Sequence, residues 1–413
     1  MRLKRILKVF LIIFLLSCYQ VSLKSVFAQE LPKLVISPSN FSKITVFVPD
    51  FKGDIPSVKK LSSLFRRVLN YHLFVLATPF KPISPSPTSY EVNGTFYEKA
   101  NTLVLKATLI SLAEEQAIKK YIIKGDPKYP YLLVYYLCDK VIKDISGYPG
   151  VAFTKIAFVK RGVLGDRLYI ADFAKANPRC IDKAPLILFP QFSWEGDKIA
   201  YLVYEKGGYQ LRIFNFLTLK RHTYQIKGLA STPVWVPGGK KLYLTLTNKK
   251  GVGIYLFDLK TKKLTPVLTG KGVYQASSVS KDGRYLAYVY DLGGDKPKVF
   301  VMDLKTRKKI RLSGIRGYNT SPKFSPKGDI LVYLCRRGGF TFLKEVNLKT
   351  GETSSIILPL FIKTFCFSPH GNYIMGYGEG YSGTGIYLIH LDSKLFFLYL
   401  RGKSFLYPAW SRL

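Results

Sequence analysis

The sequence predicts a multidomain protein, with a small N-terminal α+β domain followed by an all-β six-bladed β-propeller that the C-terminal strand closes. Three observations carry this prediction: a regular period of glycine turns, a second marker with the same period, and a C-terminal segment that matches an inner strand. The glycines are separated by 43, 44, 45 and 43 residues: Gly196, Gly239, Gly283, Gly328 and Gly371. A period of about 40–45 residues with several strands per unit is typical of a β-propeller.

The second marker is the polar residue at the end of the third apolar run of each unit, where a turn rich in lysine and glycine begins. These residues are spaced by 43 to 45 positions: Asp172, Asn215, Asp258, Asp303, Asn347 and His390. They define six units, whereas only five units contain the glycine turn. The innermost strand of the first unit must therefore come from elsewhere in the chain.

The C-terminal segment is the candidate for that missing strand. Pro408, Ala409, Trp410 and Ser411 match the segment from Pro190 to Ser193. We expect this tail to pair beside the stretch around Ile156 and to complete the blade that starts near Lys155. Such closure ties the two ends of the ring together and removes a free sheet edge.

Residues 41–150 do not follow the repeat and predict the α+β domain, which leaves residues 151–413 for the propeller. Apolar residues at helical spacing predict one helix around Leu61–His72 and a second around Val134–Ile145 that ends at Gly147. Strands are expected at residues 43–48, 72–77, 91–98, 103–112 and 117–123. Together these elements indicate a mixed sheet with two helices packed on it.

Residues 1–28 have the pattern of a signal peptide. A basic start precedes the apolar run Val9–Leu16, which is too short to cross a bilayer, and Ala28 ends a small-residue cleavage site. A competing interpretation is a lipobox at Cys18, with lipid anchoring there, and the two stay open. Residues 29–40 carry little pattern and are expected to form a flexible N-terminal arm.

The formal net charge of +37 does not by itself indicate nucleic-acid binding. The lysines and arginines are spread over the turns of every unit, and neither a recognition helix nor a zinc spacing accompanies them. We therefore expect solvated turns and no nucleic-acid partner, with attraction to an anionic envelope surface as the alternative. Four cysteines beyond Cys18 are interpreted as core residues, with their disulfide state left open: Cys138, Cys180, Cys335 and Cys366.

An exported, propeller-containing peptidase or hydrolase is the rival from another class. Ser382, in Gly380–Thr384, comes nearest to a nucleophile motif but lacks the final glycine of that motif. None of the four histidines has a metal-ligand neighbour at useful spacing. We therefore expect no catalytic, metal-binding or cofactor-binding residues and no enzyme. A lipid-anchored propeller that binds a ligand is the second alternative.

The order of signal peptide, α+β domain and propeller resembles the TolB family, over nearly the whole chain from about Leu34. The most specific parts are the ending Tyr407–Leu413 and the repeat Asn319–Gly328. The resemblance implies a periplasmic, non-enzymatic scaffold of the Tol–Pal system, which maintains the envelope and constricts the outer membrane during division. It also implies no cofactor, and a monomer is expected.

The resemblance further implies two partners. The propeller would bind a Pal-like peptidoglycan-associated lipoprotein, and the arm would contact a TolA-like inner-membrane protein through Leu34, Val35 and Ile36. The loops that enter the innermost strands are the candidate partner contacts at the propeller mouth, because a rigid ring holds such residues in place. These residues are Ala230, Ser231, Thr232, Tyr274, Gln275, Ala276, Tyr318, Asn319, Thr320 and Ser321.

Overall fold

The computed structural model describes residues 42–175, 178–228, 230–248, 251–293, 296–313 and 317–411. The expected signal peptide, the Cys18 alternative and the arm with Leu34, Val35 and Ile36 lie outside these residues. Contacts divide the chain into two compact units. Within the described residues, the terminal unit contains residues 42–187, 366–375 and 385–411, and the central unit contains residues 188–365 and 376–384.

The terminal unit begins with a six-stranded mixed sheet in the order β3-β1-β4-β5-β6, with β2 paired to β4. Its strands are β1 (Ile44–Phe47), β2 (Lys52–Gly53), β3 (Val75–Thr78), β4 (Ser89–Lys99), β5 (Thr102–Ser111) and β6 (Gln116–Gly125). Strand β1 runs parallel to β3 and β4, whereas β4, β5 and β6 are antiparallel. The strand expected from residue 72 starts only at Val75, because Leu73 takes a left-handed backbone with φ of 66°.

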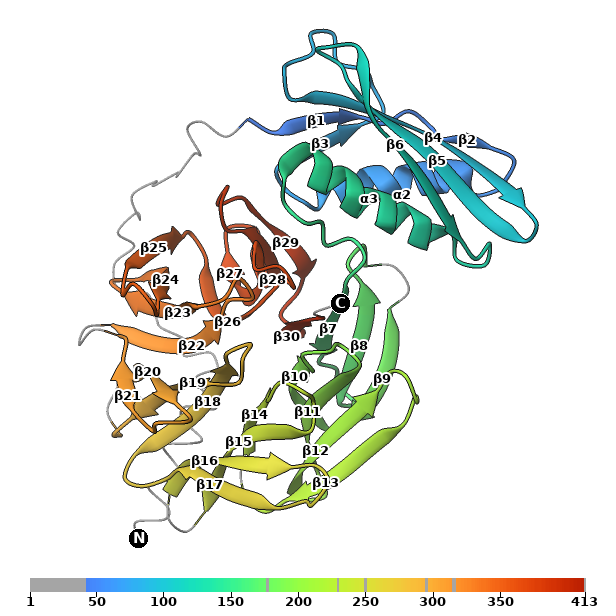
Figure 1. Cartoon of the computed structure of the whole chain (residues 1–413). Coiled ribbons are helices and arrows are strands. Elements are labelled where there is room, and N and C mark those ends of the chain that lie inside the picture. The colour runs from blue at the N-terminus through green and yellow to red at the C-terminus, as the bar shows by residue number, and fades with distance from the viewer. Residues whose placement is uncertain are drawn as a thin grey trace. The chain divides into compact units, whose positions relative to one another are not determined.

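Helices α2 (Val58–Asn70) and α3 (Pro130–Ser146) lie against one face of this sheet (Figure 1). Alternate side chains of β5 face them and are buried, as period-two alternation requires of a half-covered sheet. Helix α3 starts with a proline, whose missing N–H costs nothing at that position, and ends at Gly147 with φ of 74°. Neither α2 nor α3 has the length and apolar character needed to span a bilayer.

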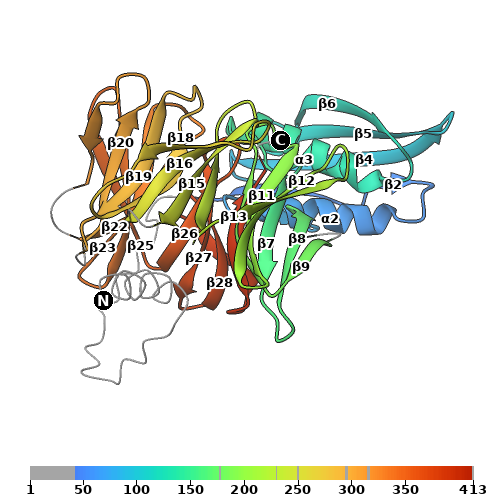
Figure 2. The same cartoon turned by 90° about the horizontal axis from the view of Figure 1, so that it is seen from below.

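A four-stranded sheet in the order β30-β7-β8-β9 belongs to the same unit, and Figure 2 shows β7, β8 and β9 beside one another. Its strands are β7 (Lys155–Lys160), β8 (Asp166–Asp172), β9 (Arg179–Ala184) and β30 (Phe405–Trp410). Trp410 lies opposite Ile156, and the backbone N–H of Lys155 donates to the hydroxyl of Ser411 at 2.9 Å. The C-terminal tail thus lies beside the stretch that the sequence predicts.

The helices also hold the segment that leads into β7. Asp139 of α3 accepts hydrogen bonds from the backbone N–H groups of Ala152 at 2.7 Å and Phe153 at 3.0 Å. His72, just after α2, accepts one from the N–H of Val151 at 3.3 Å. Because both side chains are buried or nearly so, this connection between the helical layer and the β7 sheet is internal to the unit.

The central unit is built from antiparallel sheets. The first contains β10 (Leu186–Phe192), β11 (Lys198–Glu205), β12 (Gly208–Asn215) and β13 (Arg221–Ile226), and the last contains β22 (Tyr318–Phe324), β23 (Ile330–Arg337), β24 (Phe340–Asn347) and β25 (Thr353–Leu358). Between them lies an eight-stranded sheet: β14 (Ala230–Trp235), β15 (Lys241–Asn248), β16 (Gly251–Asp258), β17 (Leu264–Leu268), β18 (Val273–Val279), β19 (Tyr285–Asp291), β20 (Lys298–Asp303) and β21 (Lys309–Arg311). Its halves are joined by a single residue pair, Val252 and Val273.

A further four-stranded sheet has the order β26-β27-β28-β29, and its residues are divided between the two units. Its strands are β26 (Phe361–Phe367), β27 (Tyr373–Gly380), β28 (Gly383–His390) and β29 (Phe396–Arg401).

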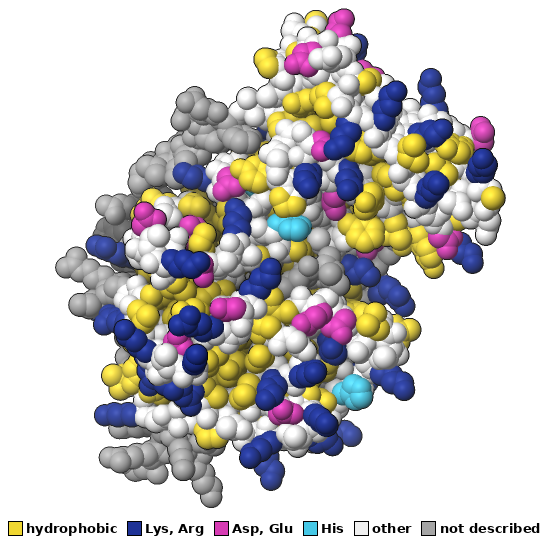
Figure 3. Space-filling model, viewed as in Figure 1, with side chains coloured by type: hydrophobic (Ala, Val, Ile, Leu, Met, Phe, Trp, Pro, Cys, Tyr) yellow, Lys and Arg dark blue, Asp and Glu magenta, His cyan; other side chains and the backbone are white. Residues whose placement is uncertain are grey.

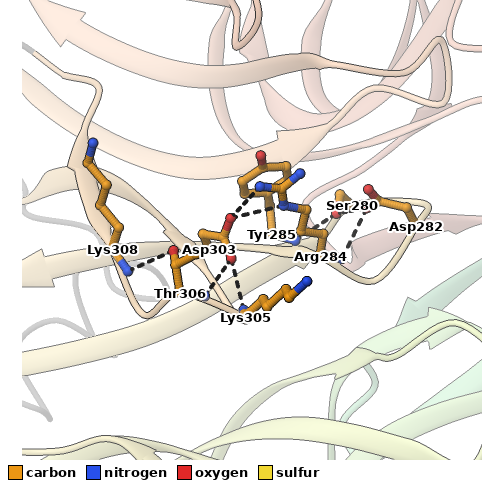
Figure 4. A network of polar contacts seen from close by, with 8 residues as sticks. All are labelled: Ser280, Asp282, Arg284, Tyr285, Asp303, Lys305, Thr306 and Lys308. Atoms are coloured by element: carbon orange, nitrogen blue, oxygen red, sulfur yellow. Dashed lines mark hydrogen bonds and ion pairs between the residues drawn. The ribbon is translucent and has the colours of Figure 1, made fainter.

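Repeated polar residues shape the turns of the central unit, and Figure 4 shows one of them, Asp303. Asp303 accepts hydrogen bonds from the backbone N–H groups of Lys305 and Thr306, at 2.8 and 2.9 Å, and forms an ion pair with Arg284. Asn215, Asp258 and Asn347 accept the equivalent pair of backbone bonds in their own sheets. The polar residue at the end of each third strand therefore closes the turn that follows it.

The cysteines are only partly where we expected them. Cys138 and Cys335 are buried and Cys366 is half-buried. The interpretation as a core residue is wrong for Cys180, which is exposed because it lies on β9, the outermost strand of its sheet.

Candidate partner-binding surface

The residues expected in mouth loops lie on strands. Ala230, Ser231 and Thr232 start β14, Tyr274, Gln275 and Ala276 belong to β18, and Tyr318, Asn319, Thr320 and Ser321 start β22. The loop assignment is therefore wrong. The second strand of each sheet continues past its apolar run and offers backbone partners to these polar residues, so that Ser231 lies opposite Thr245 and Tyr318 opposite Arg336.

Burial divides this set further. Ser231, Ala276 and Asn319 are buried, so they cannot reach a partner in this arrangement. Six residues keep part of their surface exposed, and we call them the inner-strand surface. They are Thr232, Tyr274, Gln275, Tyr318, Thr320 and Ser321.

Hydrogen bonds between neighbouring first strands hold this surface in place. The side-chain amide of Gln275 on β18 donates to the hydroxyl of Ser231 on β14 at 3.2 Å. On the other side, Lys323 of β22 donates to the carbonyl of Ser277 at 2.8 Å. Because each first strand is tied to the next, little ordering would be needed before these side chains could meet a ligand.

A β-bulge interrupts each of these first strands. The register shifts between Ser231 and Val234, between Ala276 and Ser278, and between Thr320 and Lys323. Bulges re-aim side chains and end regular pairing, and they are frequent beside functional sites. Here they occur within or directly after the residues of the inner-strand surface.

Two tyrosines give the surface its aromatic part. The ring of Tyr274 lies 4.6 Å from that of Tyr290, and burial, followed by the neighbouring Tyr290, raises the pKa of Tyr274. Tyr274 therefore stays a neutral phenol at physiological pH. Tyr318 lies beside the guanidinium of Arg336, whose Cζ is 5.7 Å from the ring centroid.

Arg336 is a residue that sequence reasoning missed. It follows a cysteine and precedes a second arginine at the end of an apolar strand, so nothing in the residue types distinguishes its half-buried side chain from the exposed Arg337. The alternation of strand faces is the only signal that could have separated the two.

The candidate nucleophile and the histidines lie apart from this surface in the chain. Ser382 lies in the turn between β27 and β28, and no hydrogen bond joins it to a histidine within the described residues. His72 and His390 are buried among aromatic rings in the terminal unit, whereas His222 is exposed on β13. Among the residues that the structure describes, no group of three or more His, Cys, Asp or Glu could hold a metal ion.

Repeated antiparallel four-stranded sheets, with the first strands of neighbouring sheets bonded to one another, define this protein as a β-propeller protein with few helices. A family model described as the TolB beta propeller domain matches residues 142–413. The chain belongs to this family.

Named relatives support the same assignment. The Tol-Pal system protein TolB of Desulfotalea psychrophila is 25% identical over 231 residues, which cover 52% of this chain and 53% of that protein. The protein of the same name from Ruthia magnifica is 28% identical over 274 residues, which cover 54% of this chain and 64% of that protein. The chain therefore spans little more than half the length of these curated relatives.

A solved structure shows the shared fold. The crystal structure of TolB from Acinetobacter baumannii has a TM-score of 0.78 at 20% identity, with 90% of this chain and 97% of that chain covered. At this identity the likeness concerns the fold alone.

Proposed function

We propose that this chain is a periplasmic protein-binding component of a Tol–Pal system. Family membership and the names of the relatives support the system. The observation that carries protein binding is the inner-strand surface, where half-exposed tyrosines and polar side chains are held by bonds between sheets. Rigid aromatic and amide groups of this kind suit protein recognition, because little entropy is lost when they bind.

The proposal includes the complete architecture. The single residue pair between the halves of the eight-stranded sheet supports counting those halves as two blades, which gives six blades in all. Strand β30 would close the ring through β7, and the α+β domain would occupy residues 41–150 and the propeller residues 151–413. The inner-strand surface would then lie at one mouth of the ring.

The family assignment supports two proposed partners. A Pal-like peptidoglycan-associated lipoprotein would bind at the inner-strand surface, and a TolA-like inner-membrane protein would bind residues 29–40 through Leu34, Val35 and Ile36. The protein would act as a monomeric adaptor without a cofactor, and it would support envelope integrity and outer-membrane constriction during division.

The first contact, between the inner-strand surface and the Pal-like lipoprotein, is tested by calorimetry. The affinity of this protein for the periplasmic domain of the organism's own Pal-like lipoprotein is measured. Tyr274→Ala and Gln275→Ala should each weaken binding by about ten-fold or more, since central contacts of an interface typically contribute at that level. Tyr224→Ala is the matched control, because Tyr224 is a partly exposed tyrosine on the outermost strand β13. Lack of binding by the wild type, or equal effects of Tyr274→Ala and Tyr224→Ala, would contradict the proposal.

Deletion of residues 29–40 tests the second contact, and it should abolish capture of the TolA-like protein while the Pal-like domain still binds. Mass spectrometry of the mature protein tests the location by identifying its first residue. A mature protein that starts at Gln29 supports the periplasmic scaffold, whereas one that starts at a lipidated Cys18 supports the anchored, ligand-binding alternative. Robust peptide or glycan hydrolysis that is lost in Ser382→Ala would instead establish the hydrolase alternative.

A further inference from the structure

Arg336 occupies an unusual position in the central unit. It lies near the end of β23, opposite Tyr318 on β22, and its Cζ is 4.4 Å from the ring centroid of Phe361 on β26. Its Nη2 donates to the backbone carbonyl of Ile362 at 3.1 Å. Its Nε is buried and has no hydrogen-bond partner within the part of the chain that the structure describes.

Among the residues that the structure describes, the positive charge of Arg336 has no acidic partner. No described Asp or Glu forms an ion pair with its guanidinium, and burial lowers the pKa of Arg336 below its usual range. The group nevertheless stays protonated, because arginine does not lose its proton under physiological conditions. Partial removal of a cation from water without a counter-charge costs free energy. The presence of Arg336 at this half-buried position therefore needs an explanation.

A second arginine of the same unit shows the usual arrangement. Arg212, on β12, is buried, and its guanidinium binds the carboxylate of Glu205 at 2.5 Å and the side-chain oxygen of Gln210. Arg336 has the rings and the backbone acceptor but lacks such a carboxylate. Figure 3 shows a related imbalance on the face it draws, where Lys and Arg side chains outnumber those of Asp and Glu.

We propose that Arg336, with Tyr318 and Phe361, forms a binding site for the carboxylate of an aspartate or glutamate on a protein partner. A guanidinium binds a carboxylate through two parallel N–H···O bonds, and flanking rings fix the plane in which it can do so. One guanidinium between two rings matches a single negative charge. Phosphate-recognition sites, by contrast, typically draw on clusters of arginines.

The residues of the site are also partly exposed. Phe361 is 41% exposed, and Tyr318 and Arg336 each keep part of their surface exposed. Because Tyr318 belongs to the inner-strand surface, this inference rests on the proposed function and names the partner group that one part of that surface recognises.

The decisive comparison is between neighbouring arginines. In calorimetry with the Pal-like periplasmic domain, Arg336→Gln should weaken binding by at least about ten-fold, because hydrogen bonds to charged groups contribute at that level. Arg336→Lys keeps the charge but not the paired geometry and should fall between this variant and the wild type. The control Arg337→Gln removes an exposed charge from the other face of the same strand and should change binding less than two-fold.

A second probe separates this inference from the proposed function. Selectively labelled arginine in the full chain is titrated with aspartate capped as an N-acetyl, N-methyl amide, and with the equivalent asparagine. The Arg336 Nε–H resonance should shift saturably with the capped aspartate only. If the wild type does not bind the Pal-like domain, the proposed function fails and this titration alone decides the site.

Two results would overturn the inference. One is a partner that binds Arg336→Gln and wild type equally, which would leave the proposed function standing. The other is an Arg336 resonance that does not respond to the capped aspartate or responds equally to the asparagine. The unfolding midpoints of both Arg336 variants show whether a loss of binding reflects a loss of fold.

Discussion

The indole Nε1 of Trp410 donates a 2.7 Å hydrogen bond to the hydroxyl of Thr154, 256 residues earlier in the chain. Thr154 in turn donates its hydroxyl hydrogen to the carbonyl of Val151 at 2.7 Å. The ring of Phe173 stacks on Trp410 with centroids 5.5 Å apart. The last strand is thereby bound to the segment that joins α3 to β7.

We therefore expect Trp410→Ala to lower the free energy of unfolding by about 3–5 kcal/mol, as for other buried large aromatic residues. Trp410→Phe should cost less, about 1–2 kcal/mol, because most of the ring contact is kept and one hydrogen bond is lost. Urea unfolding measures both. Tyr381→Phe, at a side chain that is 88% exposed, should have no effect. A cost below 1 kcal/mol for Trp410→Ala would show that the tail is not bound in this way.

Stability should depend on pH through His72. Burial lowers the pKa of His72 from 6.5 to about 4, against the opposing effect of its hydrogen bond to Val68. Between pH 6.5 and about 4, the unfolded chain therefore binds a proton at His72 that the folded chain does not bind. This group alone should remove about 3 kcal/mol of stability as pH falls from about 6.5 to about 4.

Asp139 should act in the opposite direction. Burial raises its pKa from 3.8 to about 6, although the N–H groups of Ala152 and Phe153 work against the shift. The folded chain binds this proton first, so stability present at low pH is lost as pH rises through about 6, again by about 3 kcal/mol. Between pH 6 and 4 the two groups should largely cancel.

Variants separate the two effects. With His72→Gln, stability should rise as pH falls from 6 to 4, and with Asp139→Asn it should fall over the same range. Urea unfolding across this range, with each variant referred to the wild type, gives the two slopes. Parallel curves for all three proteins would contradict both assignments.

Substitutions at Ser321 test whether the bulge in β22 requires a left-handed backbone at this position. It has φ of 53° and precedes Pro322, an arrangement that Phe189 and Tyr407 repeat before their own prolines. Left-handed backbone is poorly tolerated by β-branched residues and well tolerated by asparagine. We expect Ser321→Val to cost about 1–2 kcal/mol in thermal or urea unfolding, and Ser321→Asn to be nearly neutral. Equal stabilities would show that this backbone conformation is not required.

The thiols should differ in reactivity. Cys180 is exposed, whereas Cys138 is buried and burial raises its pKa well above the usual 9.0. Native protein treated with a maleimide should label Cys180 first, and Cys138 at least about a hundred-fold more slowly, since reactivity follows the accessible thiolate. Peptide mass mapping over time gives the rates. Cys180→Ser should remove the fast phase, and a fast phase that persists in this variant would contradict the assignment.

Much of the fold could be predicted because it depends on local patterns. The spacing of Gly196 to Gly371 indicated repeated four-stranded units, and helical spacing predicted a helix around Leu61–His72, where the structure has α2 from Val58 to Asn70. The match between Pro408–Ser411 and an inner strand placed the tail beside Ile156. These signals are encoded residue by residue, through turns, periodicity and repetition.

The candidate surface could not be predicted in the same way. Polar residues at the start of β14, β18 and β22 resemble loop residues in sequence, and only the length of the neighbouring strands makes them part of a sheet.

The sequence alone thus determined the repeat, the helices and the partner strand of the tail, since each follows from short-range pattern or internal similarity. Only the tertiary structure decided that Cys180 is exposed, that His72 and Asp139 hold one connecting segment, and that Arg336 lies between two rings without an acid. Burial and charge pairing are properties of residues far apart in the chain, and the packing of sheets is what brings those residues together or keeps them apart.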